Sequence, residues 1–591
     1  MGRALEEVVA TDLSRTRELT VVRAVRMHAL DVAFGLRPIS APGISAERQA
    51  AIAAGAGWIG YGTYTVVGGR LQASLAIEDL GARRLTRTLT ASGAPGDAIG
   101  VGSALAARYD SQAGAFSTPS EAALKDYSQA MEVPGLEQAG PLLEAAIAAD
   151  ANFGPAYRML AELQLQRQDR AAAVATLQRA VERGESIAPA ERARLAADLA
   201  GLENQPQLRL RALDAVVKFE PGDVASWQAL ASLAMNRRQF AQSVAAYRRL
   251  LDREPEDFNS WNALAYAAAY AGDWATARDA AHHYAAIRPN ELNPYDSLGD
   301  AAMLCGRFHD AEEAYLQAAR RDPGFRNNGE FYKAAMAHLW TGDIAGADTL
   351  AGKYFQARAA ANDPLLELRR IEWTWFTGAR REACRRMETL ARGSLSDVAP
   401  RAWAELAVWD LMLGDDAAAR AAAVALGPQS GGIATVIHFL LQPPGASAEW
   451  TERAERVFPA GQQAGVRNVS LTAALLLAGE FAPAADLLQH AVEAGGPQPE
   501  ETSTVLLAWA DIEAGRAQAA APFLKVTPAP AFTGPDAFLS FSFPRLFYLR
   551  GEEAARQGKR DEARANYRLF LQLSGPDPLK WGEEAKAKAA L

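Results

Sequence analysis

The sequence predicts a mostly α protein: an α-α superhelix of stacked helical hairpins, preceded by a small α/β domain. Three observations predict it. A helical pattern recurs at a spacing of 34 residues in the middle of the chain. Abundant alanine within a composition that is 49% hydrophobic suits closely packed helices. The first 118 residues instead contain runs in which apolar and polar residues alternate, as in strands.

Three consecutive segments within residues 225–323 carry the clearest repeat. Large side chains followed by a small residue leave a notch on the first helix, into which the second helix of the hairpin can pack. Gly272 and Gly306 can adopt positive φ and end the first helix, and a proline ends the second. The positions in phase are Trp227, Trp261 and Tyr295; Leu230, Leu264 and Leu298; Ala231, Ala265 and Gly299; Ala234, Ala268 and Ala302; Ser243, Ala277 and Ala311; and Pro255, Pro289 and Pro323.

This pattern resembles the tetratricopeptide repeat (TPR), and the resemblance implies a TPR solenoid that binds a protein or peptide. We expect a first part of the array over residues 119–426, a Gly/Pro-rich interruption over 427–448 with a helix near Ala434–Leu441, and a second part over 449–591 that ends in a polar capping helix. A Pro/Phe-rich insertion, residues 527–544, interrupts the second part. It is either a flap packed on the repeats or an exposed docking segment.

Residues 1–118 are expected to form the α/β domain. Leu71, Ala73, Leu75 and Ile77 alternate with polar or small residues, which indicates a sheet with one buried face, and Gly68-Gly69 is typical of a hairpin turn. The expected elements are helices at 4–14, about 46–54 and 98–109, a short strand at Leu19–Val22, a Pro/Gly-rich stretch at Leu36–Ser45, and a meander of strands at 62–67, 70–78 and 84–90.

The segments Glu6–Ser14, Leu19–Val22, Ala54–Tyr64 and Gly69–Leu75 resemble the TolB amino-terminal-like domain. In bacteria that domain often precedes TPRs in the extracytoplasmic half of membrane-bound serine/threonine kinases and related signalling proteins. The chain lacks a match to the strand with which family members begin. We therefore expect either a sheet without that strand or an N-terminally truncated fragment, and we favour the fragment because a missing strand would expose a sheet edge.

Composition argues against several classes of protein. A net charge of −9 gives no basic field to hold nucleic acid, and two cysteines cannot form a disulfide scaffold or a cysteine zinc site. No apolar run approaches the length of a transmembrane helix, so we expect no membrane insertion by this chain itself. The compartment stays open: periplasmic if the chain is a fragment of a membrane-bound signalling protein, and otherwise cytoplasmic.

No motif predicts catalysis, a metal or a cofactor. Residues Gly55–Gly60 read GxGxxG, but a dinucleotide-binding turn follows a strand and opens a helix, and here the expected order is reversed. The seven histidines form no HExxH motif, and Cys305 is expected to be a small apolar filler near the end of a helix. We therefore expect the protein not to be an enzyme.

The predicted binding site is the concave groove of the array. The TPR resemblance places four positions of each first helix in that groove. The Lys, Asn and Arg residues of a carboxylate clamp are absent there, and the aromatic, methionine, amide and acidic residues present suit an apolar or basic peptide. The candidates are Gln228, Ser232, Met235, Asn236, Asn262, Tyr266, Tyr270, Asp296, Asp300, Met303, Tyr332, Met336 and Trp340.

Two functions follow as expectations. The first is a non-catalytic protein-protein interaction scaffold that binds a partner protein or peptide through this groove. The alternative is a sensory or regulatory ectodomain of a bacterial signalling protein, such as a serine/threonine kinase, whose effector domain is not in this chain. The sequence indicates neither the partner's identity nor the oligomeric state.

Overall fold

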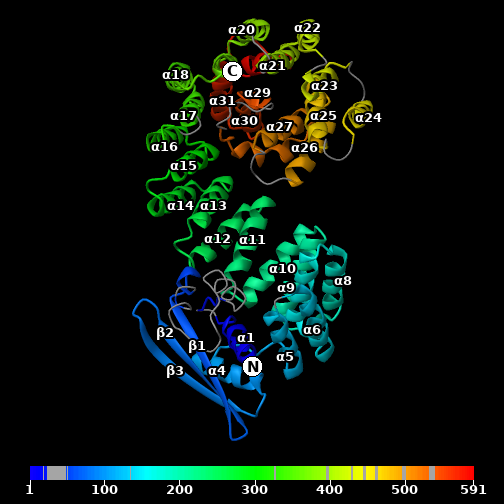
Figure 1. Cartoon of the computed structure of the whole chain (residues 1–591). Helices are drawn as coiled ribbons and strands as arrows, with labels where there is room; N and C mark the ends of the chain where they lie inside the picture. The colour runs from blue at the N-terminus through cyan, green and yellow to red at the C-terminus, as the bar shows by residue number, and fades with distance from the viewer. Residues whose placement is uncertain are drawn as a thin grey trace. The chain divides into compact units, whose positions relative to one another are not determined.

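The computed structural model describes residues 1–16, 19–22, 48, 51–133, 135–324, 328–393, 398–427, 430–442, 447–459, 464–494, 501–530 and 539–591. The chain divides into two compact units. The first comprises Met1–Ala234 and Ala245–Pro255, and the second comprises Met235–Val244 and Glu256–Leu591. The expected fold class is confirmed: a small α/β module is followed by successive helical hairpins (Figure 1).

The α/β module holds a three-stranded antiparallel sheet in the order β1-β2-β3, made of β1 (Trp58–Val67), β2 (Arg70–Asp79) and β3 (Arg84–Gly93). Gly68 and Gly69 both have positive φ and form the predicted hairpin turn. Helices α1 (Gly2–Leu13) and α4 (Ala98–Tyr109) also match the prediction. The stretch Leu36–Ser45 lies outside the described residues. Of the expected helix at 46–54, residues 46, 47, 49 and 50 also lie outside them, and residues 48 and 51–53 are helical.

The predicted strand at Leu19–Val22 is wrong. These four residues have no regular secondary structure, and none of the described strands pairs with them. The reason is a different neighbour: the carbonyl of Leu19 lies directly against Gly222, in the loop before the hairpin at 224–251, where even a Cβ would overlap it. A backbone held against that loop is not aligned with the sheet.

One face of the sheet is buried, as the alternation predicted. Leu71 and Ala73 of β2 pack with Val8 of α1 and Val101 of α4. The same core includes Leu124 of α5 (Glu121–Glu132), the first helix of the hairpin region. The module is thus packed onto the hairpins that follow it in the first unit.

The first unit continues with helices that pair in sequence order, and the second unit carries the rest of the array. The first-unit helices are α6 (Leu136–Ala149), α7 (Gly154–Gln166), α8 (Arg170–Val181), α9 (Pro189–Leu202) and α10 (Pro206–Phe219). Helices α11 (Val224–Asn236) and α12 (Phe240–Leu251) contribute residues to both units. The second unit adds α13 (Phe258–Tyr270), α14 (Trp274–Ile287), α15 (Asn293–Leu304), α16 (Phe308–Arg321), α17 (Gly329–Leu339), α18 (Ile344–Ala360), α19 (Leu366–Phe376), α20 (Arg380–Gly393), α21 (Val398–Leu413) and α22 (Asp416–Leu426).

The turns inside the hairpins follow one backbone pattern. Gly272 and Gly306 have positive φ, as predicted, and Gly342, Gly378 and Gly414 repeat this in later hairpins. The predicted notch is also present. A Cβ on Gly299 of α15 would overlap the ring of Tyr315 on α16, so glycine is what lets these two helices approach.

The end of the chain folds back onto the middle of the second unit. The interruption at 427–448 contains α23 (Gly432–Leu440), which matches the helix expected within it. The helices that follow are α24 (Ser447–Val457), α25 (Ala464–Ala478), α26 (Phe481–Ala494), α27 (Glu501–Glu513), α28 (Ala517–Ala520), α29 (Leu539–Ser542), α30 (Arg545–Arg556), α31 (Arg560–Ser574) and α32 (Glu583–Ala589). The Gln572 amide donates to the Gly342 carbonyl at 2.8 Å, and the Lys580 backbone N–H donates to the Met412 carbonyl at 3.0 Å. Figure 1 shows α29 to α31 within the arc of the other second-unit helices.

The sequence predicted that the terminal helix α32 is a polar cap facing solvent. In the structure this helix also packs against the second unit. Glu583, at its start, is buried and pairs with the equally buried Arg545 of α30 at 2.5 Å. The Arg545 guanidinium also lies over the Trp509 ring, 3.6 Å from its centroid. A polar helix therefore docks through an ion pair that its composition did not reveal. None of the described helices is long and apolar enough to cross a membrane.

Candidate functional site

The predicted groove residues lie on α11, α13, α15 and α17 or at the C-cap of α17. Gln228 and Ser232 belong to the first unit and the others to the second. Gln228 and Asn236 are exposed; Ser232, Met235, Asn262, Tyr266 and Asp300 are half-buried; Tyr270, Asp296, Met303, Tyr332, Met336 and Trp340 are buried. We call the residues of this set on α13, α15 and α17, with Trp340, the inner face.

The chain's own C-terminal part covers one end of the inner face. Trp340 is 2% exposed, because Phe543 and Phe547 lie against it with ring centroids at 5.0 and 5.1 Å. Phe543 also contacts Phe376 of α19, at 6.0 Å. Trp340 is therefore a core residue of the second unit in this conformation and is not open to a peptide.

An extended stretch covers the other end. Residues 523–530 begin with the 3-10 helix η4 (Phe523–Lys525) and continue without regular secondary structure. We call them the cis segment because they belong to the same chain as the surface that they cover; the term does not refer to a peptide-bond isomer. Val526 packs in one cluster with Ala268, Ala301 and Leu304 of α13 and α15. The Thr527 backbone N–H donates to the Leu304 carbonyl at 3.3 Å, and Thr527 is 0% exposed. A proline-containing segment thus lies against the C-terminal ends of α13 and α15, in one apolar cluster with the inner-face residues Tyr266 and Tyr270.

Arg550 of α30 holds the cis segment from the other side. Its guanidinium donates to the Leu524 carbonyl at 2.8 Å and to the Thr527 hydroxyl at 2.9 Å. Within the described part of the chain Arg550 forms no ion pair, and burial lowers its pKa to about 10. The cis segment therefore meets a half-buried cation whose partners among the described residues are neutral oxygens.

The insertion at 527–544 is a packed flap as far as it is described. Val526 and Thr527 before the gap are buried, as are Phe541 and Phe543 after it. Phe532 and Phe538 lie outside the described residues. The burial favours the first of the two interpretations that the sequence left open.

Between the two covered ends lies a buried polar cluster. Asp300 accepts hydrogen bonds from the hydroxyls of Tyr266 and Tyr315, both at 2.8 Å. Lys333 of α17 pairs with Asp300 at 2.6 Å and with Asp296. Burial, and then the Asp300 charge, raises the pKa of both tyrosines well above the usual value, so both stay protonated and donate.

Two further carboxyls make the cluster sensitive to pH. Burial and the neighbouring Asp300, opposed by Lys333, raise the pKa of Asp296 to about 6. Burial and the charge of Asp296 raise the pKa of Glu330 to about 9. Glu330 is therefore protonated at neutral pH and can donate to Asp296, which a carboxylate could not do.

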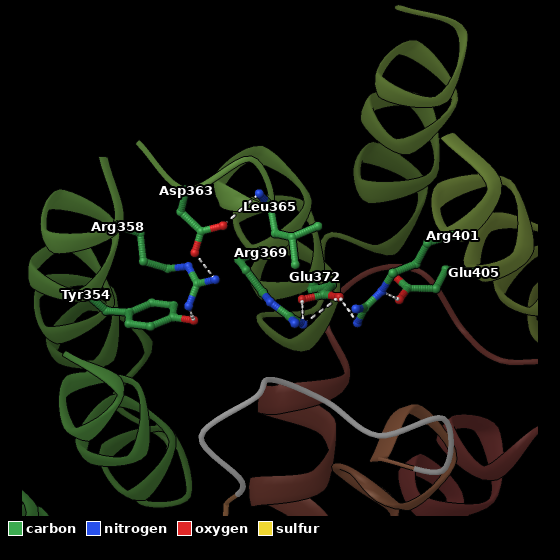
Figure 2. Close-up of polar contacts among 8 residues, drawn as sticks. All are labelled: Tyr354, Arg358, Asp363, Leu365, Arg369, Glu372, Arg401 and Glu405. Atoms are coloured by element: carbon green, nitrogen blue, oxygen red, sulfur yellow. Dashed lines mark hydrogen bonds and ion pairs between the residues drawn. The ribbon is translucent and has the colours of Figure 1, made fainter. Parts of the chain in front are cut away.

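A second buried network follows on α18 to α21 (Figure 2). Arg369 donates to both oxygens of Glu372, at 3.0 and 2.8 Å, and Arg401 reaches Glu372 at 3.4 Å and Glu405 at 3.1 Å. Beside them Arg358 pairs with Asp363 and donates to the Tyr354 hydroxyl at 2.8 Å. Burial and the Glu405 charge raise the pKa of Glu372 to about 8.

These clusters fit a structural role better than a chemical one. The carboxylates are engaged by lysine, arginine or tyrosine, and the described residues contain no group of His, Cys, Asp and Glu that could hold a metal ion. Burial raises the pKa of the Cys305 thiol to about 11, as expected for a filler rather than a nucleophile.

Sequence reasoning placed Tyr266, Asp296 and Asp300 on one face but missed their partners. Tyr315, Glu330, Lys333 and Arg550 were not among the candidates. One signal was available: Glu330 and Lys333 lie three residues apart within an otherwise apolar helix, which is unusual unless they face a buried partner. Nothing local marks Arg550, whose contacts are with residues far away in the chain.

No protein-family model matches this chain, and no curated protein matches it. Among solved structures the chain is similar to MamA, with 18% identity over 30% of this chain and 96% of that one and a TM-score of 0.25. It is also similar to YrrB, described as a TPR protein with an unusual peptide-binding site, with 14% identity over 31% and 93% and a TM-score of 0.28. A third is PilW, described as a widely conserved type IV pilus biogenesis factor, with 16% identity over 36% and 96% and a TM-score of 0.26.

Proposed function

We propose that the chain is a non-catalytic scaffold that binds a partner protein on the inner face of its second unit, at the place that the cis segment occupies. One observation carries the proposal: an extended segment with two prolines already lies there, buried against α13 and α15. A surface that accommodates such a segment from its own chain has the shape and the chemistry to accommodate one from another protein.

The contacts of the cis segment suit an exchangeable ligand. Pro528 and Pro530 have no N–H to donate. Among the described residues, one backbone hydrogen bond joins the segment to α13 or α15. It runs from the Thr527 N–H to the Leu304 carbonyl, and its length of 3.3 Å is at the long end of the usual range. The segment is attached by apolar contacts of Val526 in the cluster of α13 and α15, by those of Leu524 and Ala529 in the main core of the second unit, and by two hydrogen bonds from Arg550. A partner with similar side chains can replace these contacts one for one.

Arg550 indicates what the partner presents. Among the described residues Arg550 has no counter-ion, and a desolvated cation of this kind gains more from a carboxylate than from a hydroxyl. We therefore expect an apolar residue followed by Thr, Ser or an acidic residue in the partner. A basic residue opposite Arg550 is disfavoured, so the sequence-based expectation of an apolar or basic peptide narrows to an apolar one.

Displacement has to overcome the advantage of a tethered ligand. A segment joined to its site by a short linker acts at an effective concentration of about a millimolar. A partner must therefore bind the open inner face more tightly than that, or also contact residues outside it. Asn236, which is exposed on α11, is a predicted position outside the inner face that is available for such contacts.

The test is capture of partners by an opened variant. Val526→Asp with Thr527→Lys places a charge in the apolar cluster and a second cation beside Arg550, so the cis segment should leave the inner face. The opened full chain should capture a protein that the wild-type chain captures at least tenfold less, and a synthetic peptide of residues 521–530 should elute it. Lys525→Asp is the matched control, because Lys525 is exposed within the same segment. Equal capture by both chains, unaffected by the peptide, would overturn the proposal.

The remaining expectations stay predictions. They are the TolB-like identity of the first module, the ectodomain alternative and the absence of nucleic-acid binding.

A further inference from the structure

A second open surface lies in the first unit, along the hairpin of α9 and α10. The cleft there has a volume of about 540 Å³. Its floor consists of small side chains from both helices, Ala196, Ala200, Ala212 and Ala215. Small residues along two adjacent helices let a third helix approach closely, so a helix can pack on this floor.

Two large apolar side chains stand exposed at the ends of this cleft. Leu208, in the first turn of α10, is 47% exposed, and Phe219, its last residue, is 49% exposed. Eleven positions along a helix correspond to roughly 16 Å at a rise of 1.5 Å per residue. A single helix of about three turns can therefore cover both side chains at once, and this length sets the size of the ligand.

Arginines flank the apolar floor. Arg192 of α9 and Arg211 of α10 line the cleft, and in the described part of the chain neither forms an ion pair. The acid that lines it, Glu203, already accepts a hydrogen bond from Gln178 at 2.9 Å. The rim therefore carries two positive charges and one negative charge, a net positive charge, although the chain as a whole carries a net charge of −9.

Arginines in this part of the fold differ in their partners. Arg194, also on α9, is buried and bridges Glu220 and Asp223, the latter at 2.5 Å. Arg170 of α8 instead donates to a backbone carbonyl. Arg192 and Arg211 line the cleft without an acidic partner among the described residues, so acidic side chains of a ligand would complement them.

We propose that the cleft between α9 and α10 docks an amphipathic helix of a partner protein, with an apolar stripe against the alanine floor and acidic residues beside Arg192 and Arg211. This docking site is independent of the inner face of the second unit. The apolar floor provides the contact area, and the arginines select the charge of the helix.

The probe is a synthetic 18-residue helix with leucines along one stripe and glutamates on both sides of it. Its counterpart keeps the stripe and replaces every glutamate by lysine. Fluorescence anisotropy with the full chain should show binding of the glutamate peptide at least tenfold tighter than that of the lysine peptide. Leu208→Glu should weaken the glutamate peptide at least tenfold, whereas Leu165→Glu, at an exposed leucine on α7 of the same unit, should leave it unchanged.

The charge-reversal variant guards against loss of folding. Arg192→Glu with Arg211→Glu should bind the lysine peptide more tightly than the glutamate peptide, a gain that an unfolded chain cannot give. Equal binding of both peptides by the wild-type chain, no binding of the glutamate peptide, or indifference to Leu208→Glu would overturn the proposal. Concentration-dependent dimerisation that Leu208→Glu abolishes would assign the cleft to a second copy of the chain and would equally overturn it.

Discussion

Trp340 and Phe543 meet nearly edge to face, with ring centroids 5.0 Å apart and planes inclined at 75°. One ends α17 in the middle of the array, and the other precedes α30 near the end of the chain. Through this contact the inner face and the C-terminal helices share one core. The repeat position of Trp340 predicts that it lies in an open groove, but here its ring packs against the C-terminal part of the same chain.

Phe543→Ala should destabilise the second unit. The side chain is buried against Trp340 and Phe376, and removal of a buried phenylalanine ring costs roughly 3–5 kcal/mol. Urea unfolding should show the loss in the transition of the second unit. Val424→Ala, at an exposed position of α22, is the control and should change the free energy of unfolding by less than about 0.5 kcal/mol. A Phe543→Ala chain as stable as the control would contradict the packing described.

The stability of the second unit should fall as pH rises from about 5 to about 9. The folded-state pKa of Glu330, about 9, lies above its ordinary value of 4.5, so in this range the folded chain holds a proton that the unfolded chain has released. The folded state thus loses stability with rising pH, at up to about 1.4 kcal/mol per pH unit from Glu330. Glu330→Gln, which is permanently neutral, should reduce this slope and raise stability at pH 8 to 9, whereas the part that comes from Glu372 remains. A slope that Glu330→Gln leaves unchanged would rule out the titration of Glu330 as its cause.

Gly299→Ala should destabilise the hairpin of α15 and α16. The added methyl group would overlap the ring of Tyr315, whose hydroxyl is held by Asp300, and such overpacking costs roughly 1–3 kcal/mol. Gly352→Ala is the matched control, because Gly352 is also helical and its Cβ would meet nothing within 4 Å. It should stabilise by roughly 0.5–1 kcal/mol through helix propensity. Thermal unfolding of the two variants measures both effects. Melting temperatures that shift in the same direction would contradict the close packing of α15 and α16 at Gly299.

The ion pair of Arg545 and Glu583 should be costly to break on one side. Arg545→Met leaves Glu583 buried without its partner, which typically costs about 3–5 kcal/mol. The double variant Arg545→Met, Glu583→Met removes both charges and should recover much of that loss. The double-mutant cycle measures the coupling by urea unfolding. If the double variant is as unstable as the sum of the two single ones, α32 is not docked through this pair.

The sequence predicted what depends on neighbouring residues. The spacing of Gly272 and Gly306, the notch at Gly299 and the Gly68-Gly69 hairpin are local patterns, and each is present. The groove assignments also followed a local rule and placed Tyr266, Asp296 and Asp300 on one face correctly. That rule assumes an open array. It could not show that Phe543 and Val526, distant in the chain, would cover Trp340 and Leu304.

The same distinction explains the buried charges. Each acid or base in the cluster around Asp300 looks like a surface residue when taken alone. Only the packing of α13, α15, α16 and α17 brings Lys333, Glu330 and Tyr315 to the same place. Truncation of Tyr270 or Trp340 would reduce stability whether or not a partner binds there, so such a variant alone does not test binding in the groove.

The occupation of the inner face by the cis segment is tested most directly by adding that segment as a separate molecule. A fluorescently labelled peptide of residues 521–530 is titrated with the wild-type chain, with the Val526→Asp, Thr527→Lys variant, and with the Lys525→Asp control. The account predicts saturable binding to the opened variant and binding at least tenfold weaker to the other two, whose own segment fills the site. Equal affinity for all three chains, or no binding to an opened variant that circular dichroism shows to be folded, would contradict it.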